Sequence, residues 1–524
     1  MTNKKLIRST GVISSATILS RILGFARDVL IAGRFGTGIY ADAFWVAFRL
    51  PNTLRDMVGE GATDAAIVPI LTEYRHARTQ KEYWDVARVM LNLMLTVLIT
   101  LSVLGVVFAP ILVRVIAPGF LNDPEKFNIT VLLTRMMFPY ILLIGMVAYS
   151  KGVLNSFHYF LTPALAPVIL NTTMILALIF LCPIIGIKGV IIGVLVGGVF
   201  QVLIQIRPLQ GRGLRLSRDF KLAHPIAKRI GKLLLPRAVG AGVYQLSVLV
   251  DTILASLSKI VGAGGVSALQ YSSRLVQLPV AVFGISLVTA ALPKMSKEAA
   301  AKDIGALRNT INFSLRAIFT VMIPAAAGLI ILARPIVSIL FQRGEFTAYS
   351  TDITSSALFF YSFGLVAYAG IKILVSGYYS MGDTRTPVKT AAISLAINVV
   401  LNLILMGPLK VGGLALATSI AASINFLILY VLLVKRIGDI GTFKIFITFL
   451  KVCAATIVMV IFTVFSDKIF LTRQLPFFIL VGRLLMVVVG SGVVYTISAY
   501  ITRVENVHKL WKLLWDGRKK KDEG

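Results

Sequence analysis

Arginine side chains stand inside stretches of sequence that are otherwise apolar. The first of these stretches runs from about Gly11 to Ala32 and carries Arg21, Arg27 and Asp28. An arginine near the centre of a bilayer costs from roughly 2.5 to more than 10 kcal/mol, so such residues face a water-filled cavity or an ionic partner. The first stretch therefore predicts a wet cavity between transmembrane helices.

The spacing in this stretch gathers polar groups on one helical face. Arg21 and Asp28 are seven residues apart, which is two helical turns, so they share a face with Gly24 between them. Arg27 lies on the adjacent stripe with Asp28 beside it, so the two could pair structurally. Ser20 and Gly24 are the small residues that we expect to line the cavity next to these charges.

A second charged stretch follows at once. Asp42 and Arg49 are again seven residues apart, and this spacing favours a structural pairing between them. Pro51 interrupts the helical ladder and predicts a kink, after which Arg55 follows. Glu60 belongs to a carboxylate stripe that continues toward the cytoplasmic interface.

A further arginine lies in the second half of the chain. Arg274 stands in an apolar stretch with no acidic residue nearby in sequence, so an ion pair on its own helix is not expected. Both halves of the chain thus contribute cations to the predicted cavity.

Composition defines the elements that must position these residues. The chain has 524 residues, 57% of them hydrophobic and 15% charged, and a mean hydropathy of +0.85. Apolar segments of about 20 residues recur along it, each long enough to cross the membrane as a helix, and we count about fourteen. The fold class expected is an all-α polytopic membrane protein, because ten-residue alternating barrel strands do not fit these runs.

Charge sets the orientation of these spans. The net charge of +30 is scattered over short loops rather than gathered in a basic domain, so we expect no nucleic-acid partner. Lysine and arginine are concentrated in alternate loops, and the positive-inside rule therefore places both termini in the cytoplasm. The tail interleaves Trp511 and Trp515 with basic residues, which is typical of a segment that touches membrane lipids.

An internal repeat organises the chain. Asp28 to Ala32 recurs as Asp251 to Ala255 at an offset of 223 residues, and two proline pairs, Pro69 with Pro293 and Pro163 with Pro387, recur at 224. A proline-bearing segment also follows the third helix of both copies. We predict an N-terminal six-helix lobe over residues 1–222, a parallel six-helix lobe over 223–441, and two extra helices with a basic tail over 442–524.

This organisation predicts a transporter that works by alternating access between two lobes. A membrane enzyme is disfavoured, because the four histidines lie in predicted loops or the tail and no HExxH motif is present. A scaffolding protein would have little reason to keep intramembrane arginines in both halves.

Several motifs together resemble a known family. They are SRILGFARD at 20–28, ADAF at 41–44, FRLPN at 48–52, EGA at 60–62 and FQRGEFT at 341–347. These segments, with the two extra C-terminal helices, resemble the MurJ (MviN) lipid II flippase family of the multidrug/oligosaccharidyl-lipid/polysaccharide exporter superfamily.

The resemblance implies export of lipid II, an undecaprenyl-pyrophosphate-linked peptidoglycan precursor, across a bacterial cytoplasmic membrane. Pyrophosphate oxygens suit guanidinium forks, which stay charged at every accessible pH. By the resemblance, Arg21, Arg27, Arg55 and Arg274 would form the anion-binding cluster, Asp28 would orient Arg27, and Asp42 would be a cavity or gate carboxylate. The two extra helices would line a groove for the polyprenyl tail.

The energy source is a separate question, and no organic cofactor is expected. Some relatives hold sodium in the second lobe, and oxygen ligands could come from Asp251, Asn398, Asn402 and Thr418 here. An amide at Asn402 stands where a carboxylate is expected, which weakens the site and favours ordinary interhelical hydrogen bonding. The membrane potential is the other candidate, because moving one charge across about 100 mV is worth about 2.3 kcal/mol.

Two related transporters remain alternatives. A flippase for another polyprenyl-pyrophosphate-linked oligosaccharide would need the same arginines. A cation-coupled multidrug exporter would need acidic and aromatic cavity walls, which the excess of arginine disfavours.

Overall fold

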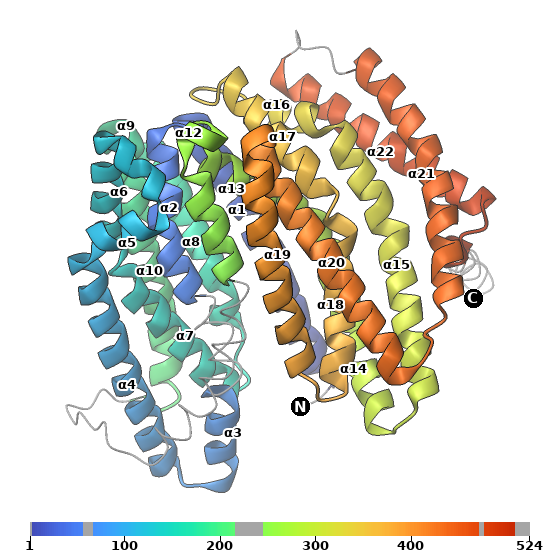
Figure 1. The fold of residues 1–524 in the computed structure, drawn as a ribbon. Helices are drawn as coiled ribbons and strands as arrows, with labels where there is room; N and C mark the ends of the chain where they lie inside the picture. The colour runs from blue at the N-terminus through green and yellow to red at the C-terminus, as the bar shows by residue number, and fades with distance from the viewer. Residues whose placement is uncertain (1–2, 56–66, 215–244, 471–475, 509–524) are drawn as a thin grey trace. The chain divides into compact units, whose positions relative to one another are not determined.

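The computed structural model describes residues 3–55, 67–214, 245–470 and 476–508 (Figure 1). Within these ranges every regular element is a helix. The chain divides into two compact units, residues 1–259 and 260–524. The predicted lobe boundary at residue 222 lies outside the described residues, and the boundary at 441 falls between two helices of the second unit, so the three-part division stays a prediction.

The first unit is built from long helices joined by short ones. Its elements are α1 (Asn3–Phe35), α2 (Ile39–Arg55), α3 (Val68–Ala77), α4 (Gln80–Val107), α5 (Ala109–Ile116), η2 (Pro118–Asn122), α6 (Pro124–Met137), α7 (Tyr140–Ser156), α8 (Leu161–Phe180), α9 (Cys182–Ile185), α10 (Lys188–Gln210) and the helix Gln245–Ala255. The short helix α12 (Ser258–Val261) follows at the boundary between the units.

The second unit is also built from long helices joined by short ones. Its elements are α13 (Gly265–Pro279), η3 (Val280–Gly284), α14 (Ile285–Ala300), α15 (Ile304–Ile331), α16 (Ala333–Phe341), α17 (Ala348–Ser362), α18 (Leu365–Ser380), α19 (Arg385–Leu409), α20 (Val411–Ile437), α21 (Thr442–Phe470) and α22 (Phe477–Ile501). The π-helical turn η3 directly follows Pro279, which cannot donate a backbone hydrogen bond.

Ten of the described helical segments are long and apolar enough to cross a membrane. Helices α17 and α18 together add an eleventh span, bent by 45° at the break between them. The chain is therefore a multi-pass all-α membrane protein, as predicted. The remaining predicted spans coincide with α1, α2 and the shorter helix Gln245–Ala255, so the total of fourteen is consistent with the structure.

The internal repeat is visible in the positions of the helices. Helices α4, α5 and α6 begin at residues 80, 109 and 124, and α15, α16 and α17 begin at 304, 333 and 348, each 224 residues later. The capping residues follow the same interval, because Thr79 and Asp303 cap the first pair and Asp123 and Thr347 cap the last. Each cap's side-chain oxygen accepts from a backbone N–H that the helix leaves unpaired. The two proline-bearing segments noticed in the sequence are thus equivalent short helices, α5 and α16.

Glycine allows the helices of the first unit to pack closely. A Cβ added at Gly193 on α10 would lie 2.6 Å from the Ala177 Cβ on α8, and one added at Gly197 would lie 2.3 Å from the Thr173 hydroxyl oxygen. Small residues at helix contacts let backbones approach in a membrane, where van der Waals packing drives association. The same helix α8 also packs against α1 and holds it in place.

Polar side chains attach the last two helices to the second unit. Arg316 on α15 donates from Nε to the Thr448 hydroxyl on α21 at 2.8 Å, and from Nη2 to the Glu505 carboxylate beyond α22 at 2.5 Å. The Tyr495 hydroxyl on α22 donates to the Thr320 carbonyl oxygen at 2.6 Å. These bonds explain why α21 and α22 belong to the second unit.

Candidate functional site

The guanidinium of Arg27 is buried on α1 and is held by three side chains. Its Nε and Nη2 donate to Oδ1 of Asp28 at 2.9 and 2.7 Å, which makes a buried ion pair. Its Nη1 donates to Oδ1 of Asn171 on α8 at 2.9 Å and lies 3.8 Å from the Met174 sulfur. Arg27 and Asp28 are 6% and 1% exposed, so solvent screens this pair weakly.

Asn171 ties this cluster to the backbone of α1. Its Nδ2 donates to the Ser20 carbonyl oxygen at 3.0 Å and lies 3.4 Å from the Ser20 hydroxyl oxygen. Gly24 lies beside it, because a Cβ added there would be in van der Waals contact with the same Nδ2, at 3.4 Å. Ser20 and Gly24 therefore contact Asn171. Sequence reasoning missed Asn171, because this residue lies 151 positions from Ser20 in the chain. An asparagine in the otherwise apolar α8 was the available signal.

Arg21 differs from Arg27 in its surroundings. Its side chain is exposed, and within the described ranges its guanidinium has no hydrogen-bond or ion-pair partner. The two arginines of α1 are thus in different states. Arg27 is fixed by the protein, whereas Arg21, six residues earlier, is accessible. A guanidinium without a carboxylate partner can accept a phosphate or carboxylate in a bidentate geometry.

Asp42, at the start of α2, forms a buried ion pair with a residue that the sequence did not indicate. Lys126 Nζ on α6 donates to Asp42 Oδ2 at 2.7 Å, and the two side chains are 8% and 1% exposed. The same ammonium lies 4.2 Å from the centre of the Phe120 ring. This pair links α2 to α6, and the pairing of Asp42 with Arg49, a half-buried residue of α2, stays a prediction.

Close packing joins η2 to the residues that follow the helix Gln245–Ala255. The Gly119 amide donates to Oγ of Ser256, and a Cβ at Gly119 would lie 2.7 Å from the Cα of Leu257. By the repeat offset of 223, residues 251–255 at the end of that helix are the counterpart of residues 28–32 on α1. Only glycine fits there without displacement of a backbone.

Two of the predicted site residues lie at the end of the described range 3–55 or beyond it. Arg55 is the last residue of α2, but its side chain is outside the described part of the chain. Glu60 falls in 56–66, also outside the described residues. Their roles stay predictions.

Arg274 lies half-buried on α13 in the second unit. The neighbouring Tyr271 is fully buried and packs on the rings of Phe341 and Phe346, with ring centres 5.5 and 5.8 Å away. Both phenylalanines belong to the motif at 341–347, in which Gly344 takes a positive φ of 54°. The motif is therefore a tight turn that anchors α13 between α16 and α17.

The candidate sodium ligands of the second unit form a hydrogen-bonded row between α19 and α20. Asn402 Nδ2 donates to Asn398 Oδ1 at 3.1 Å, and Asn398 Nδ2 donates to the Thr418 hydroxyl oxygen at 3.2 Å. Both asparagines are buried, and Asp251 belongs to the first unit. Among the described residues no cluster of three histidine, cysteine or acidic side chains could hold a metal ion.

Comparison with known proteins places the chain among flippases. A family model described as Lipid II flippase MurJ matches residues 31–486. A probable lipid II flippase MurJ from Buchnera aphidicola is 33% identical over 453 residues, which cover 86% of this chain and 88% of that one. A lipid II flippase MurJ from Burkholderia cenocepacia is 36% identical over 441 residues, covering 82% and 84% of the two chains.

Solved structures agree in fold. A lipid II flippase MurJ in an inward closed conformation superposes with a TM-score of 0.80 at 28% identity, over 94% of this chain and 99% of that one. An inward-facing MATE family multidrug resistance transporter of the MOP superfamily gives a TM-score of 0.68 at 16% identity, over 82% and 98% of the two chains, which is a likeness of fold alone.

Proposed function

Because the chain belongs to the lipid II flippase MurJ family, we propose that it moves lipid II from the cytoplasmic to the outer leaflet of the bacterial cytoplasmic membrane. Flippases are transporters, so the chain is a transporter and not an enzyme. Both termini lie in the cytoplasm, and the two copies of the repeat rock to expose a central cavity to either side in turn.

The observation that supports this proposal is the unequal state of the two arginines on α1. Arg21 is accessible and makes the first contact with the pyrophosphate of the lipid. Arg27 is held by Asp28 and Asn171, so the pyrophosphate must compete with both for its guanidinium. A pyrophosphate can win this competition because it carries several negative charges and offers bidentate oxygens.

The remaining cations complete the site in this proposal. Arg55 and Arg274 contribute charge from α2 and α13, so that anion binding draws the two copies of the repeat toward one ligand. Release of Arg27 would then couple substrate binding to the packing of α1 on α8. The electrostatic gain at the lipid's pyrophosphate offsets the ion pair lost with Asp28.

Two sources of driving force fit the chain. A cation held by Asp251, Asn398, Asn402 and Thr418 would couple transport to sodium, whereas the membrane potential would act on the charged cavity directly. Since Asn398 and Asn402 already donate amide hydrogen bonds to neighbouring oxygens, we favour the membrane potential.

The proposal is tested by the appearance of lipid II in the outer leaflet of cells depleted of their own flippase. The parent chain should restore it, and Arg27→Ala and Arg274→Ala should not, although both variants insert and remain monodisperse. Arg385→Ala, which changes an exposed arginine at the start of α19, is the matched control. Arg27→Lys should be partly active because the ammonium keeps the charge but loses the fork.

Failure of a correctly inserted parent chain would contradict lipid II as the substrate. The assay would then be repeated with another polyprenyl-pyrophosphate-linked oligosaccharide, the alternative that needs the same arginines.

A further inference from the structure

A cavity of about 860 Å³ lies in the second unit, and none of the arginines assigned above lines it. The end of α15, one side of α16, the end of α21 and the start of α22 line it. Figure 1 shows α16, drawn in yellow, and the red helices α21 and α22 in this unit. By the predicted topology these helix ends lie at the outer surface of the membrane, because α21 starts after a basic cytoplasmic loop.

The charged side chains that line this cavity are mainly cationic. Arg334, Arg343 and Lys468 line it together with one carboxylate, Asp467. Arg334 is already neutralised, because its Nη2 lies 2.7 Å from Oδ1 of Asp352. Arg343, Lys468 and Asp467 make no ion pair within the described residues, so about one positive charge is left uncompensated at the cavity.

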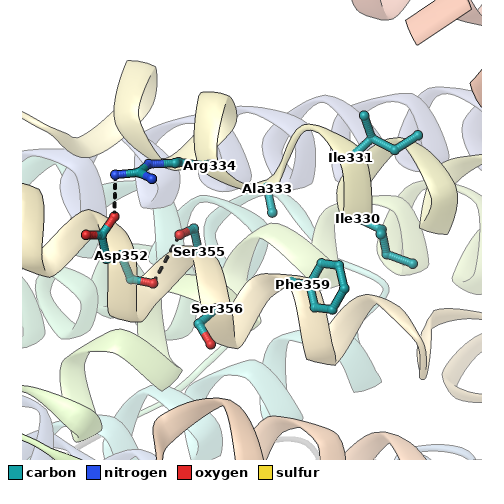
Figure 2. Close-up of a pocket in the computed structure, with 8 residues that line it drawn as sticks. All are labelled: Ile330, Ile331, Ala333, Arg334, Asp352, Ser355, Ser356 and Phe359. Atoms are coloured by element: carbon teal, nitrogen blue, oxygen red, sulfur yellow. Dashed lines mark hydrogen bonds and ion pairs between the residues drawn. The ribbon is translucent and has the colours of Figure 1, made fainter. Parts of the chain in front are cut away.

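A smaller cavity of about 400 Å³ shows how Arg334 is held (Figure 2). It shares Ile331 and Arg334 with the larger one, and the Arg334–Asp352 pair spans its polar rim. In Figure 2 the guanidinium points to Asp352 at one end, and Phe359 and Ile330 lie at the other. Arg334 is therefore neutralised by Asp352, although it also lines the larger cavity.

Arg343 is fixed in place rather than free in solvent. Its guanidinium lies 4.5 Å from the centre of the Phe477 ring on α22, and its Nη2 donates to the carbonyl oxygens of Ile339 and Leu340 at the end of α16. Partial burial lowers the pKa of Arg343, yet a guanidinium stays protonated at any physiological pH. A positioned guanidinium loses little entropy when it binds a phosphate.

Apolar side chains occupy the rest of the lining and continue beyond it. Pro335, Ile339 and Leu480 line the cavity, and Ile469 and Phe478 on the neighbouring helix ends are 63% and 85% exposed. Exposed apolar side chains of this kind contact acyl chains when the protein is in a bilayer. A ligand here would have an anionic head beside a hydrocarbon tail.

We propose that this cavity binds the phosphodiester headgroup of an anionic phospholipid from the outer leaflet. The phosphate lies between Arg343 and Lys468, and the acyl chains lie along the exposed apolar side chains of α21 and α22. A phosphodiester carries a single negative charge and so matches the one uncompensated positive charge, whereas a pyrophosphate would carry more. The site is therefore a lipid site distinct from the transport cavity, and it does not depend on which lipid the chain transports.

The full chain, purified in detergent, tests this proposal by native mass spectrometry with added phosphatidylglycerol or with phosphatidylcholine of the same acyl chains. The parent chain should bind phosphatidylglycerol more tightly than phosphatidylcholine. Lys468→Gln and Arg343→Gln should each weaken that binding about fivefold, the effect of one basic residue at an anionic membrane surface. Arg385→Gln, the same change at an exposed arginine outside the cavity, should leave it unchanged.

Two results would overturn the assignment. Equal binding of the two lipids by the parent, or unaltered phosphatidylglycerol binding by Lys468→Gln, would show that the cavity does not recognise an anionic headgroup. Glycerol phosphate without acyl chains should not compete with the lipid, and equal competition would identify a site for free phosphate esters instead. Arg343→Lys keeps the charge and should retain most of the binding, which separates loss of charge from a folding defect.

Discussion

The amide of Gly119 donates a hydrogen bond to Oγ of Ser256 at 3.1 Å, and a Cβ added at Gly119 would lie only 2.0 Å from the Ser256 carbonyl oxygen. Both clashing partners, Ser256 and Leu257, present backbone atoms, which cannot rotate away as a flexible side chain could. The 3-10 helix η2 and the residues after the helix Gln245–Ala255 therefore meet here through a contact that one methyl group would open.

Gly119→Ala should destabilise this packed arrangement. Overpacking costs typically 1–3 kcal/mol, and about 1.4 kcal/mol already changes a conformational population tenfold. We expect a lower thermal unfolding midpoint and transport reduced about tenfold. Gly328→Ala is the control, because a Cβ at Gly328 meets nothing within 4 Å. Equal behaviour of the two variants would mean that the Gly119 contact does not limit transport.

Asn171 should control how readily Arg27 leaves its ion pair. Asn171→Asp would add a second carboxylate to the guanidinium, so we expect transport to fall while the thermal midpoint is kept or raised. Asn171→Ala removes a hydrogen bond to a charged group and should cost about 1.5–3 kcal/mol of stability.

The matched control for Asn171 is its exposed neighbour Thr172, whose hydroxyl bonds only to the Val168 carbonyl oxygen of its own helix. Thr172→Ala should change neither the midpoint nor transport. Parent-like transport by Asn171→Asp would contradict competition between the substrate and the ion pair of Arg27.

The buried pair of Asp42 and Lys126 should matter for stability. Removal of one partner leaves an uncompensated buried charge, so Asp42→Asn and Lys126→Met should each cost about 3–5 kcal/mol, measured by thermal or denaturant unfolding in detergent. The double variant should recover most of the loss. Asp85→Asn, which affects a half-exposed pair with Arg88 at 3.6 Å, should cost less than about 1 kcal/mol. Additive losses in the double variant would show that the two residues act independently.

Sequence reasoning found the interactions that lie within one helix and missed those between helices. Adjacency predicted the pair of Arg27 and Asp28, and equal motif spacing predicted the repeat that the helix positions display. The partners of Asp42 and Arg27 on other helices lie 84 and 144 residues away. Helical spacing compares residues on one helix only, so it could indicate Arg49 for Asp42 but neither Lys126 nor Asn171.

The asparagine row between α19 and α20 gives a test of the coupling ion. Asn402 supplies an amide to Asn398, and a neutral amide set attracts a hard cation less than one that includes a carboxylate. The parent chain should therefore show the same thermal midpoint in sodium and in choline buffers.

Asn402→Asp should acquire a sodium-dependent rise in that midpoint, because the new carboxylate would be buried beside the oxygens of Asn398 and Thr418. Ser394→Asp, about two turns before Asn402 on α19 and bonded to the Ala421 carbonyl oxygen, controls for the added charge and should lack that dependence. A sodium-dependent midpoint in the parent would instead assign sodium as the coupling ion, and the membrane potential would no longer be the favoured source.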